Sequence, residues 1–227
     1  MPAYFTPNLN ILPPGQRELW PLLAAVPARF TLYGGTALAV KLGHRESVDF
    51  DFFSSQAFDP NQLHAGLGFL HSGRITQSSE NTLSCVVPFA KGQAQVSFLG
   101  DLTLPRVEDP LLTDDNRIHV ASLVDVGGMK MALIQKRGEA KDYVDIAALL
   151  DAGQTLERLL SAGQTIYGKQ FNPAVAVRAL GFFDDLKGDQ LSPAVKRTIQ
   201  NAVASVRLDS LPALPSRGII GEVGLAQ

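Results

Sequence analysis

The alternation of apolar and polar positions predicts a mixed α and β structure for the first half of the chain. Runs with the two-residue period of strands are separated by segments with the three- and four-residue spacing of helices. The strand-like runs cover residues 29–33, 48–53, 74–78, 82–87 and 93–99, and the helical segments cover 16–25, 36–42 and 61–70. Lys91-Gly92, between the last two runs, indicates a hairpin turn. We therefore predict an α+β domain over residues 1–120, with a mixed sheet and flanking helices.

The second half of the chain has helical spacing almost to its end. Prolines and acidic residues between positions 105 and 116 indicate a loop or linker that precedes it. The predicted helices cover residues 123–136, 140–150, 155–162, 173–186 and 193–206. The tail from Leu211 has no clear period, and we find no internal repeat. These features predict a separate helical region over residues 121–227.

The composition is that of a folded protein without a general affinity for polyanions. Of the 227 residues, 45% are hydrophobic and 19% are charged, which supplies a core and argues against a disordered chain. The net charge of −2 argues against a nucleic-acid coat protein but leaves room for a local basic groove. No apolar run approaches the roughly 18 residues of a membrane-spanning helix, and no apolar segment follows the first cation, Arg17. We expect a cytoplasmic protein that does not contact membranes.

The first candidate site is the turn Gly34-Gly35-Thr36, between a predicted strand and a predicted helix. Glycines let a backbone approach a phosphate closely, and a helix N-terminus offers unpaired N–H groups and the positive end of its dipole. Taken alone, such a turn is more often only a tight connection. It therefore indicates a phosphate site only when a second signal accompanies it.

The second signal is the strand that contains Asp49 and Asp51. Residues two apart on a strand share a face, so the carboxylates converge while Val48, Phe50 and Phe52 face the core. Paired carboxylates repel each other unless a cation joins them, and oxygen ligands suit Mg²⁺. The alternative is a pair of strand-end aspartates in solvent. Nearby Arg45 could contact a phosphate or pair with either aspartate, and the sequence favours neither.

The two signals together resemble a known family. A glycine pair after an apolar strand, thirteen residues, then Asp49-Phe50-Asp51-Phe52 resembles the signature of the nucleotidyltransferase superfamily, whose fold is that of DNA polymerase β. The fuller pattern looks like the AbiEii/AbiGii branch, the toxin halves of type IV toxin–antitoxin systems. This resemblance implies an NTP with its phosphates on Gly34, Gly35 and Thr36, and Mg²⁺ on the two aspartates. It also implies NMP transfer to an acceptor hydroxyl, in some relatives that of tRNA, and an antitoxin partner.

A second block resembles the same family. It contains Lys130 and Arg137, which are seven residues apart and so share one face if the helix predicted over residues 123–136 continues to Arg137, and Asp142 and Asp145, three residues apart on the next helix. Read without the resemblance, the block is a solvated charged face with surface ion pairs. The resemblance implies instead that Lys130 and Arg137 neutralise phosphate charge. Asp142 is then the candidate base or acceptor-orienting residue.

One departure from the family pattern concerns a third carboxylate, which enzymes of the superfamily carry on a later strand. The corresponding run here has Gln95 and Ser97 where an acid is expected. Asp101 or Asp142 could substitute, and of these we favour Asp142 because Pro105 indicates that the strand is ending. Without a substitute, catalysis is reduced or absent.

Two other functions stay open. One, which the missing third carboxylate supports, is a degenerate fold that binds a nucleotide or a protein partner without doing chemistry. The other is a small-molecule nucleotidyltransferase like the aminoglycoside-modifying branch, which the lack of a strongly basic composition favours over an RNA acceptor.

Overall fold

The computed structural model describes residues 3–115, 118–183 and 191–222. The chain divides into two compact units, and each is described here by itself. The first unit contains Met1–Thr103, Asp109–Ser122 and Gly218–Gln227, and the second contains Leu104–Glu108 and Leu123–Arg217. This division differs from a single boundary near residue 120 at two short segments. Leu104–Glu108 precedes that position but belongs to the second unit, and Gly218–Gln227 follows it but belongs to the first.

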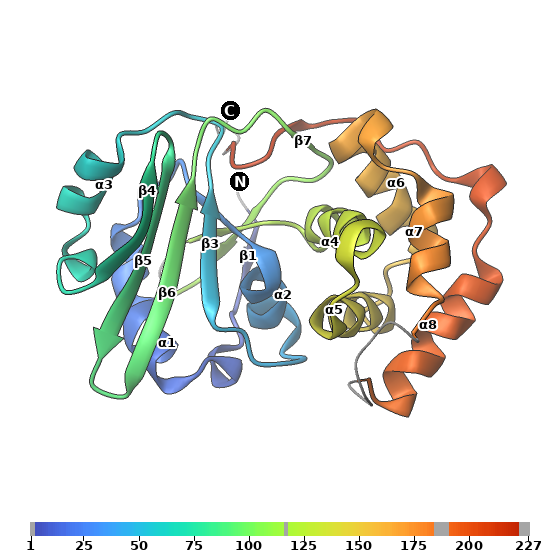
Figure 1. Ribbon diagram of the computed structural model, residues 1–227, viewed down its shortest axis with the longest axis horizontal. Coiled ribbons are helices and arrows are strands. Elements are labelled where there is room, and N and C mark those ends of the chain that lie inside the picture. The colour runs from blue at the N-terminus through green and yellow to red at the C-terminus, as the bar shows by residue number, and fades with distance from the viewer. Residues whose placement is uncertain (1–2, 116–117, 184–190, 223–227) are drawn as a thin grey trace. The chain divides into compact units, whose positions relative to one another are not determined.

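The first unit is built on an eight-stranded mixed sheet (Figure 1). Its strand order is β1-β8-β9-β2-β3-β6-β5-β4. The strands are β1 (Tyr4–Phe5), β2 (Thr31–Tyr33), β3 (Asp49–Phe53), β4 (Arg74–Ser79), β5 (Thr82–Phe89), β6 (Gly92–Leu99), β8 (Leu111–Thr113) and β9 (His119–Val120). Two further short strands are β7 (Pro105–Arg106) in the second unit and β10 (Gly218–Ile219) in the first. The α+β class predicted from the sequence is confirmed.

Strand β3 lies in the middle of this sheet and carries both candidate aspartates. Strand β2 pairs with it antiparallel on one side, and β6 pairs with it parallel on the other. The second pairing places Gln95 opposite Asp49, and Ser97 opposite Asp51. The hairpin from β5 to β6 is confirmed, but Phe89 pairs with Gly92, so its turn residues are Ala90 and Lys91.

Short helices complete the first unit. They are the 3₁₀ segment η1 (Leu9–Ile11), α1 (Pro14–Leu19), η2 (Trp20–Ala25), α2 (Gly34–Leu42), α3 (Pro60–Gly66) and η3 (Gly68–Leu70). Pro21 has no N–H to donate, so the helix predicted over 16–25 divides into α1 and η2. The start of α3 is as predicted, with the side chain of Asp59 accepting a hydrogen bond from the Asn61 N–H. Its predicted continuation to Leu70 is replaced by the separate 3₁₀ turn.

The core of the first unit lies against the aromatic residues of β3. Phe50 and Phe52 are fully buried, and the Phe52 ring stacks on Phe98 of β6 with centroids 5.3 Å apart. The prediction that Val48 shares this core is wrong, because its side chain is 52% exposed. Val48 precedes the first paired residue of β3, so the neighbouring strands do not cover it.

The second unit is helical. It contains α4 (Leu123–Arg137), α5 (Ala140–Asp151), α6 (Leu156–Tyr167), η4 (Gly168–Gln170), α7 (Pro173–Leu180), α8 (Pro193–Ser205) and η5 (Leu208–Ser210). Helices α4 and α6 approach closely at Gly128, where an added Cβ would lie 2.8 Å from the Cβ of Ala162. The helix predicted over 173–186 ends at Leu180, and residues 184–186 lie outside the described part of the chain. No described helix is long and apolar enough to cross a membrane.

Candidate active site

The glycine turn at the start of α2 is shaped by contacts that leave no room for side chains. Gly34 has φ +72°, and a Cβ built on it would lie 2.6 Å from Oδ2 of Asp51. A Cβ on Gly35 would lie 2.5 Å from Nη2 of Arg45. Strand register explains the first approach, because Tyr33, the last residue of β2, pairs with Asp51. The turn therefore brings backbone directly against one carboxylate and one guanidinium.

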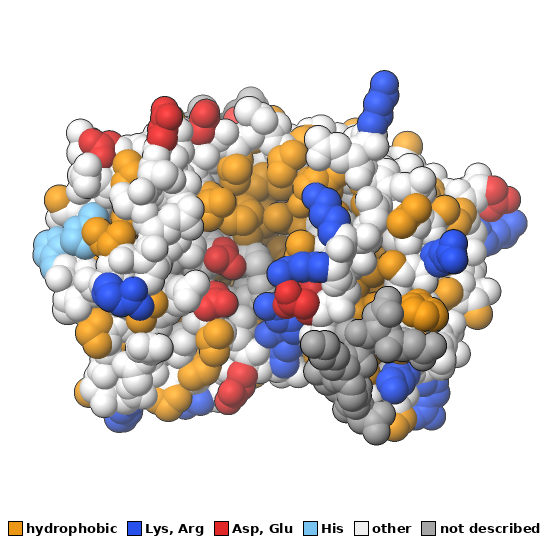
Figure 2. Space-filling model, in the orientation of Figure 1, with side chains coloured by type: hydrophobic (Ala, Val, Ile, Leu, Met, Phe, Trp, Pro, Cys, Tyr) orange, Lys and Arg blue, Asp and Glu red, His pale blue; other side chains and the backbone are white. Residues whose placement is uncertain are grey.

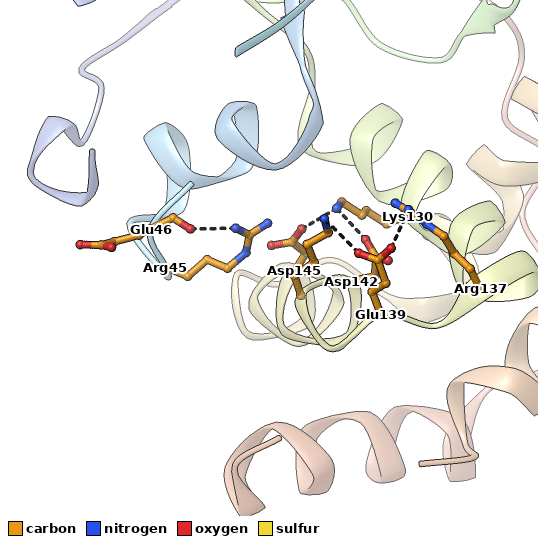
Figure 3. Close-up of polar contacts among 8 residues, drawn as sticks. Arg45, Glu46, Lys130, Arg137, Glu139, Asp142 and Asp145 are labelled. Atoms are coloured by element: carbon orange, nitrogen blue, oxygen red, sulfur yellow. Dashed lines mark hydrogen bonds and ion pairs between the residues drawn. The ribbon is translucent and has the colours of Figure 1, made fainter. Parts of the chain in front are cut away.

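The N-terminus of α2 is suited to an anion. Its cap residue, Tyr33, makes no side-chain cap hydrogen bond, and the first turn of the helix has no acidic residue. The Arg45 guanidinium next to Gly35 adds a full positive charge, and its Nη1 donates to the carbonyl oxygen of Glu46 at 2.8 Å (Figure 3). Helix N–H groups, the helix dipole and an arginine together favour a phosphate group at this turn.

Thr36 has an interior position that the sequence did not indicate. Its side chain is fully buried, and its hydroxyl hydrogen-bonds with Ser47 Oγ at 2.8 Å and donates to the carbonyl oxygen of Asp49. These bonds tie the first turn of α2 to the start of β3. The hydroxyl is thus engaged within the protein, and a contribution of Thr36 to phosphate binding would come from its backbone N–H.

The two aspartates of β3 lie on the face predicted for them. Asp49 and Asp51 are partly exposed, whereas Phe50 and Phe52 between and after them are fully buried. The Asp49 carboxylate makes no hydrogen bond or ion pair with any described residue. Two hard oxygen ligands beside a glycine cradle fit Mg²⁺, which usually completes its coordination with waters and substrate phosphates. No described group of three or more His, Cys, Asp or Glu side chains is arranged to hold a metal ion.

The register of β6 decides which residues stand where a third carboxylate is expected. Gln95 and Ser97 are the direct neighbours of Asp49 and Asp51 and face the same side of the sheet. Ser97 is 8% exposed, and its Oγ accepts a hydrogen bond from Ser84 Oγ at 3.1 Å. Asp101 lies four residues beyond Ser97, about 13 Å along the strand direction. Its N–H bonds the carbonyl of Gln56, so Asp101 belongs to the opposite end of the sheet.

In the second unit, Lys130 forms a buried ion triad with two aspartates of α5 (Figure 3). Its Nζ lies 2.8 Å from Oδ1 of Asp142 and 2.7 Å from Oδ2 of Asp145, and both carboxylate side chains are fully buried. Asp142 and Asp145 share a helix face, as their spacing predicts. A solvated charged face, the alternative for this block, is wrong for these three residues. The second oxygen of Asp142, Oδ2, has no hydrogen-bond partner among the described residues.

Arg137 lies in a different environment at the end of α4. Its side chain is 50% exposed and contacts Glu139 at 2.6 Å, and Lys141 contacts the other oxygen of Glu139 at 2.9 Å. A hydrogen bond from Lys141 is the main reason that the pKa of Glu139 is lowered. Arg137 is thus an accessible cation, whereas Lys130 is enclosed. The shared helix face of the two cations did not reveal this difference.

Sequence reasoning missed a cavity beside Asp49. Its lining includes Asp49 and Gln95 together with Gln16 of α1 and Lys91 of the hairpin turn. The side chain of Gln16 is 3% exposed, and its Nε2 donates to the carbonyl of Val48 at 2.9 Å. The sequence signal that could have found the cavity is the exposed polar alternation of β6, in which Gln93 and Gln95 precede the buried Val96.

A glycine turn thus lies against one of two aspartates that share a face of the central strand of a mixed sheet. The comparisons show that the protein is a nucleotidyltransferase. The profile of the family described as "Nucleotidyl transferase AbiEii toxin, Type IV TA system" matches residues 22–212. Because the match spans most of the chain, the protein belongs to this family of nucleotidyltransferase toxins.

Other proteins are similar to this chain in sequence or in fold. An uncharacterized protein of Aquifex aeolicus (strain VF5) is 31% identical over 161 residues, which cover 70% of this chain and 75% of that protein. Among solved structures, MenT4, a nucleotidyltransferase toxin from Mycobacterium tuberculosis H37Rv, superposes with a TM-score of 0.60 at 15% identity, covering 86% of this chain and 83% of MenT4. A candidate nucleotidyltransferase from H. pylori gives 0.54 at 13% identity, covering 84% and 93%. At these identities the two structures show a shared fold.

Proposed function

We propose that this enzyme transfers a nucleoside monophosphate from an NTP to an acceptor hydroxyl and depends on Mg²⁺ held by Asp49 and Asp51. The observation that best supports the proposal is the close approach of Gly34 to Asp51, which sets a phosphate-binding turn directly beside a carboxylate. In the reaction, the acceptor oxygen bonds to the α-phosphorus while the bond from that phosphorus to the β-phosphate oxygen breaks. Pyrophosphate leaves with the electron pair, and the hydroxyl proton passes to a base.

The residues of the first unit bind and orient the nucleotide in this proposal. The phosphates lie on the backbone N–H groups of Gly34, Gly35 and Thr36, and Arg45 adds charge-assisted hydrogen bonds. Bound Mg²⁺ would neutralise charge that develops on the phosphate oxygens. Phosphoryl transfer needs mainly positioning and charge stabilisation, and these residue types supply both.

The proposed roles of the second unit's residues rest on different kinds of observation. Arg137 is accessible and is assigned to the phosphates by the family resemblance alone. For Lys130 the same assignment stays a prediction, and its ammonium has a second role in holding Asp142 and Asp145. Asp142 is the proposed base, because Oδ2 retains a lone pair without a described partner. Asp142 is fully buried, so proton transfer to it requires that the packing of α4 and α5 opens.

The family name supports the biological part of the proposal, in which the protein is a cytoplasmic toxin neutralised by a cognate antitoxin protein. We further propose that the acceptor is an RNA such as tRNA. On the face shown in Figure 2, Lys and Arg side chains occur in small groups among acidic and hydrophobic ones. A small basic group of this kind suits contact with a few phosphates of an RNA.

A second candidate function is nucleotide or partner binding without transfer. The specific observation in its favour is that Gln95 and Ser97 occupy the two positions of β6 where a third carboxylate is expected. The Asp49 and Asp51 pair would then hold Mg²⁺ and nucleotide, while the acceptor hydroxyl would lack activation.

The deciding experiment incubates the protein with Mg²⁺ and each NTP labelled at the α-phosphate, in the presence of either bulk RNA or an aminoglycoside. We expect label to enter RNA, and we expect no incorporation in EDTA or with the Asp51→Ala variant. Calorimetric titration of the protein with the same NTP measures nucleotide binding independently of transfer. Nucleotide binding without transfer to RNA or to aminoglycosides would establish the binding protein instead.

The assignment of Arg137 has its own test, in which NTP affinity is measured for Arg137→Ala. A lost charge-assisted phosphate contact weakens binding by about 1–3 kcal/mol. Lys136→Ala is the matched control, because Lys136 is the adjacent exposed cation and points about 100° away around the helix. Equal losses in both variants would indicate only a general basic surface.

A further inference from the structure

The first unit has a cavity of about 430 Å³ directly beside Asp49. It lies between the start of α1, the start of β3 and the hairpin of β5 and β6. Its lining includes Pro14, Gln16, Val48, Asp49, Lys91 and Gln95. The volume is in the range of sites for small ligands, which usually combine apolar walls with a few polar groups.

The position of the cavity relative to the glycine turn follows from strand order. Strand β3 lies between β2 and β6, so the glycine turn after β2 and Gln95 on β6 flank the aspartates from opposite sides. Asp51 contacts the glycine turn, and Asp49 lines the cavity. In a displacement at phosphorus, the attacking and leaving oxygens lie roughly in line, so the acceptor approaches from the side away from the leaving pyrophosphate.

We propose that this cavity is the acceptor subsite and that it takes a nucleotide, with Lys91 holding the phosphate next to the reacting sugar. The inference rests on the proposed transfer function. It assigns the choice of acceptor to Lys91 and Gln95.

The side chains of the cavity fit a nucleotide. The amide of Gln95 and the ammonium of Lys91 are exposed and make no hydrogen bond or ion pair with any described residue, so both can serve a ligand. Pro14 and the 52% exposed Val48 offer apolar surface for a base or a ribose. An amide that donates and accepts suits base edges and ribose hydroxyls, and an ammonium suits a phosphate.

The charges of the cavity disfavour an aminoglycoside. Such a polycation requires several carboxylates, whereas Asp49 is the one acidic residue among the described residues of the lining, and the proposal already uses it for Mg²⁺. A nucleotide brings negative charge to Lys91 and needs no further acid. The same chemistry is present at the 3′ end of an RNA strand and in a free mononucleotide.

The experiment measures transfer from a labelled NTP to three acceptors: a short oligoribonucleotide with a free 3′ hydroxyl, a mononucleotide and an aminoglycoside. We compare wild type with Lys91→Ala, Lys91→Arg and Gln95→Ala, and with Lys169→Ala as the control for an exposed lysine of the second unit. Each KM is determined separately for acceptor and NTP.

We expect wild type to use a nucleotide acceptor, and Lys91→Ala to raise its KM roughly tenfold while the KM for NTP stays constant. Lys91→Arg should restore most of the affinity, and Lys169→Ala should behave as wild type. A preference for the oligoribonucleotide over the mononucleotide identifies the RNA end as the source. Transfer that is insensitive to both Lys91→Ala and Gln95→Ala, or that favours the aminoglycoside, overturns the acceptor subsite alone. Absence of transfer to every acceptor overturns the proposed function as well.

Discussion

Replacement of Lys130 by methionine should strongly destabilise the second unit. Met has a similar length but no charge, so the substitution removes the ammonium and leaves Asp142 and Asp145 fully buried without it. At separations of 2.8 and 2.7 Å, each contact contributes about 6 kcal/mol of attraction at an effective dielectric constant near 20, much of it offset by desolvation. Removing one partner of a buried ion pair usually costs about 3–5 kcal/mol. Because two carboxylates lose the same cation here, we expect a loss of about 4–5 kcal/mol.

The measurement is the free energy of unfolding from urea titration, together with the melting temperature. For a chain of this size, each kcal/mol lowers the melting temperature by about 2–4 °C, which predicts a decrease of about 8–20 °C. Lys141→Met is the matched control. Lys141 is 52% exposed and contacts Glu139 at 2.9 Å, so its loss should cost less than about 1 kcal/mol.

A compensating substitution tests the cause of this effect. Lys130→Met combined with Asp142→Asn should recover part of the lost stability, because one buried charge is removed together with its partner. A loss below about 1 kcal/mol for Lys130→Met, or a loss equal to that of Lys141→Met, would refute the reasoning. It would mean that the triad is hydrated and that its burial contributes little.

Three further predictions concern the first unit. Asp49→Ala or Asp51→Ala should abolish Mg²⁺-dependent transfer. The melting temperature without metal should stay the same or rise, because each substitution removes one of two carboxylates that repel each other. A large decrease in melting temperature would show that the pair is structural. Gly34→Ala should lower the transfer activity at least tenfold and the free energy of unfolding, measured by urea titration, by about 1–2 kcal/mol. The reason is that Gly34 has a left-handed φ and that an added Cβ would lie 2.6 Å from Oδ2 of Asp51. Gln95→Glu should increase kcat at saturating acceptor by supplying a third carboxylate next to Asp49, while loss of the amide raises the KM for the acceptor. An unchanged kcat would mean that another group, such as Asp142, is the base.

The sequence alone determined the features of this protein that depend on local periodicity. Asp49 and Asp51 share a face and Phe50 lies on the other because side chains alternate along any strand. The turn at Gly34 could be predicted from the sequence because only glycine readily adopts the positive φ found there. The cap at Asp59 and the hairpin after β5 follow in the same way from residues that are neighbours in the sequence.

Tertiary structure decided everything that depends on which distant segments meet. The pairing of Gln95 with Asp49 is a register between parallel strands, and no turn connects those strands to fix it. Lys130 and Arg137 lie on one face of α4, yet only Lys130 is enclosed, because α5 brings two aspartates against it and not against Arg137. The exposure of Val48 and the cavity next to it likewise depend on how far neighbouring strands and α1 extend over the start of β3. Periodicity predicts which residues share a face, but packing between remote segments determines what covers that face.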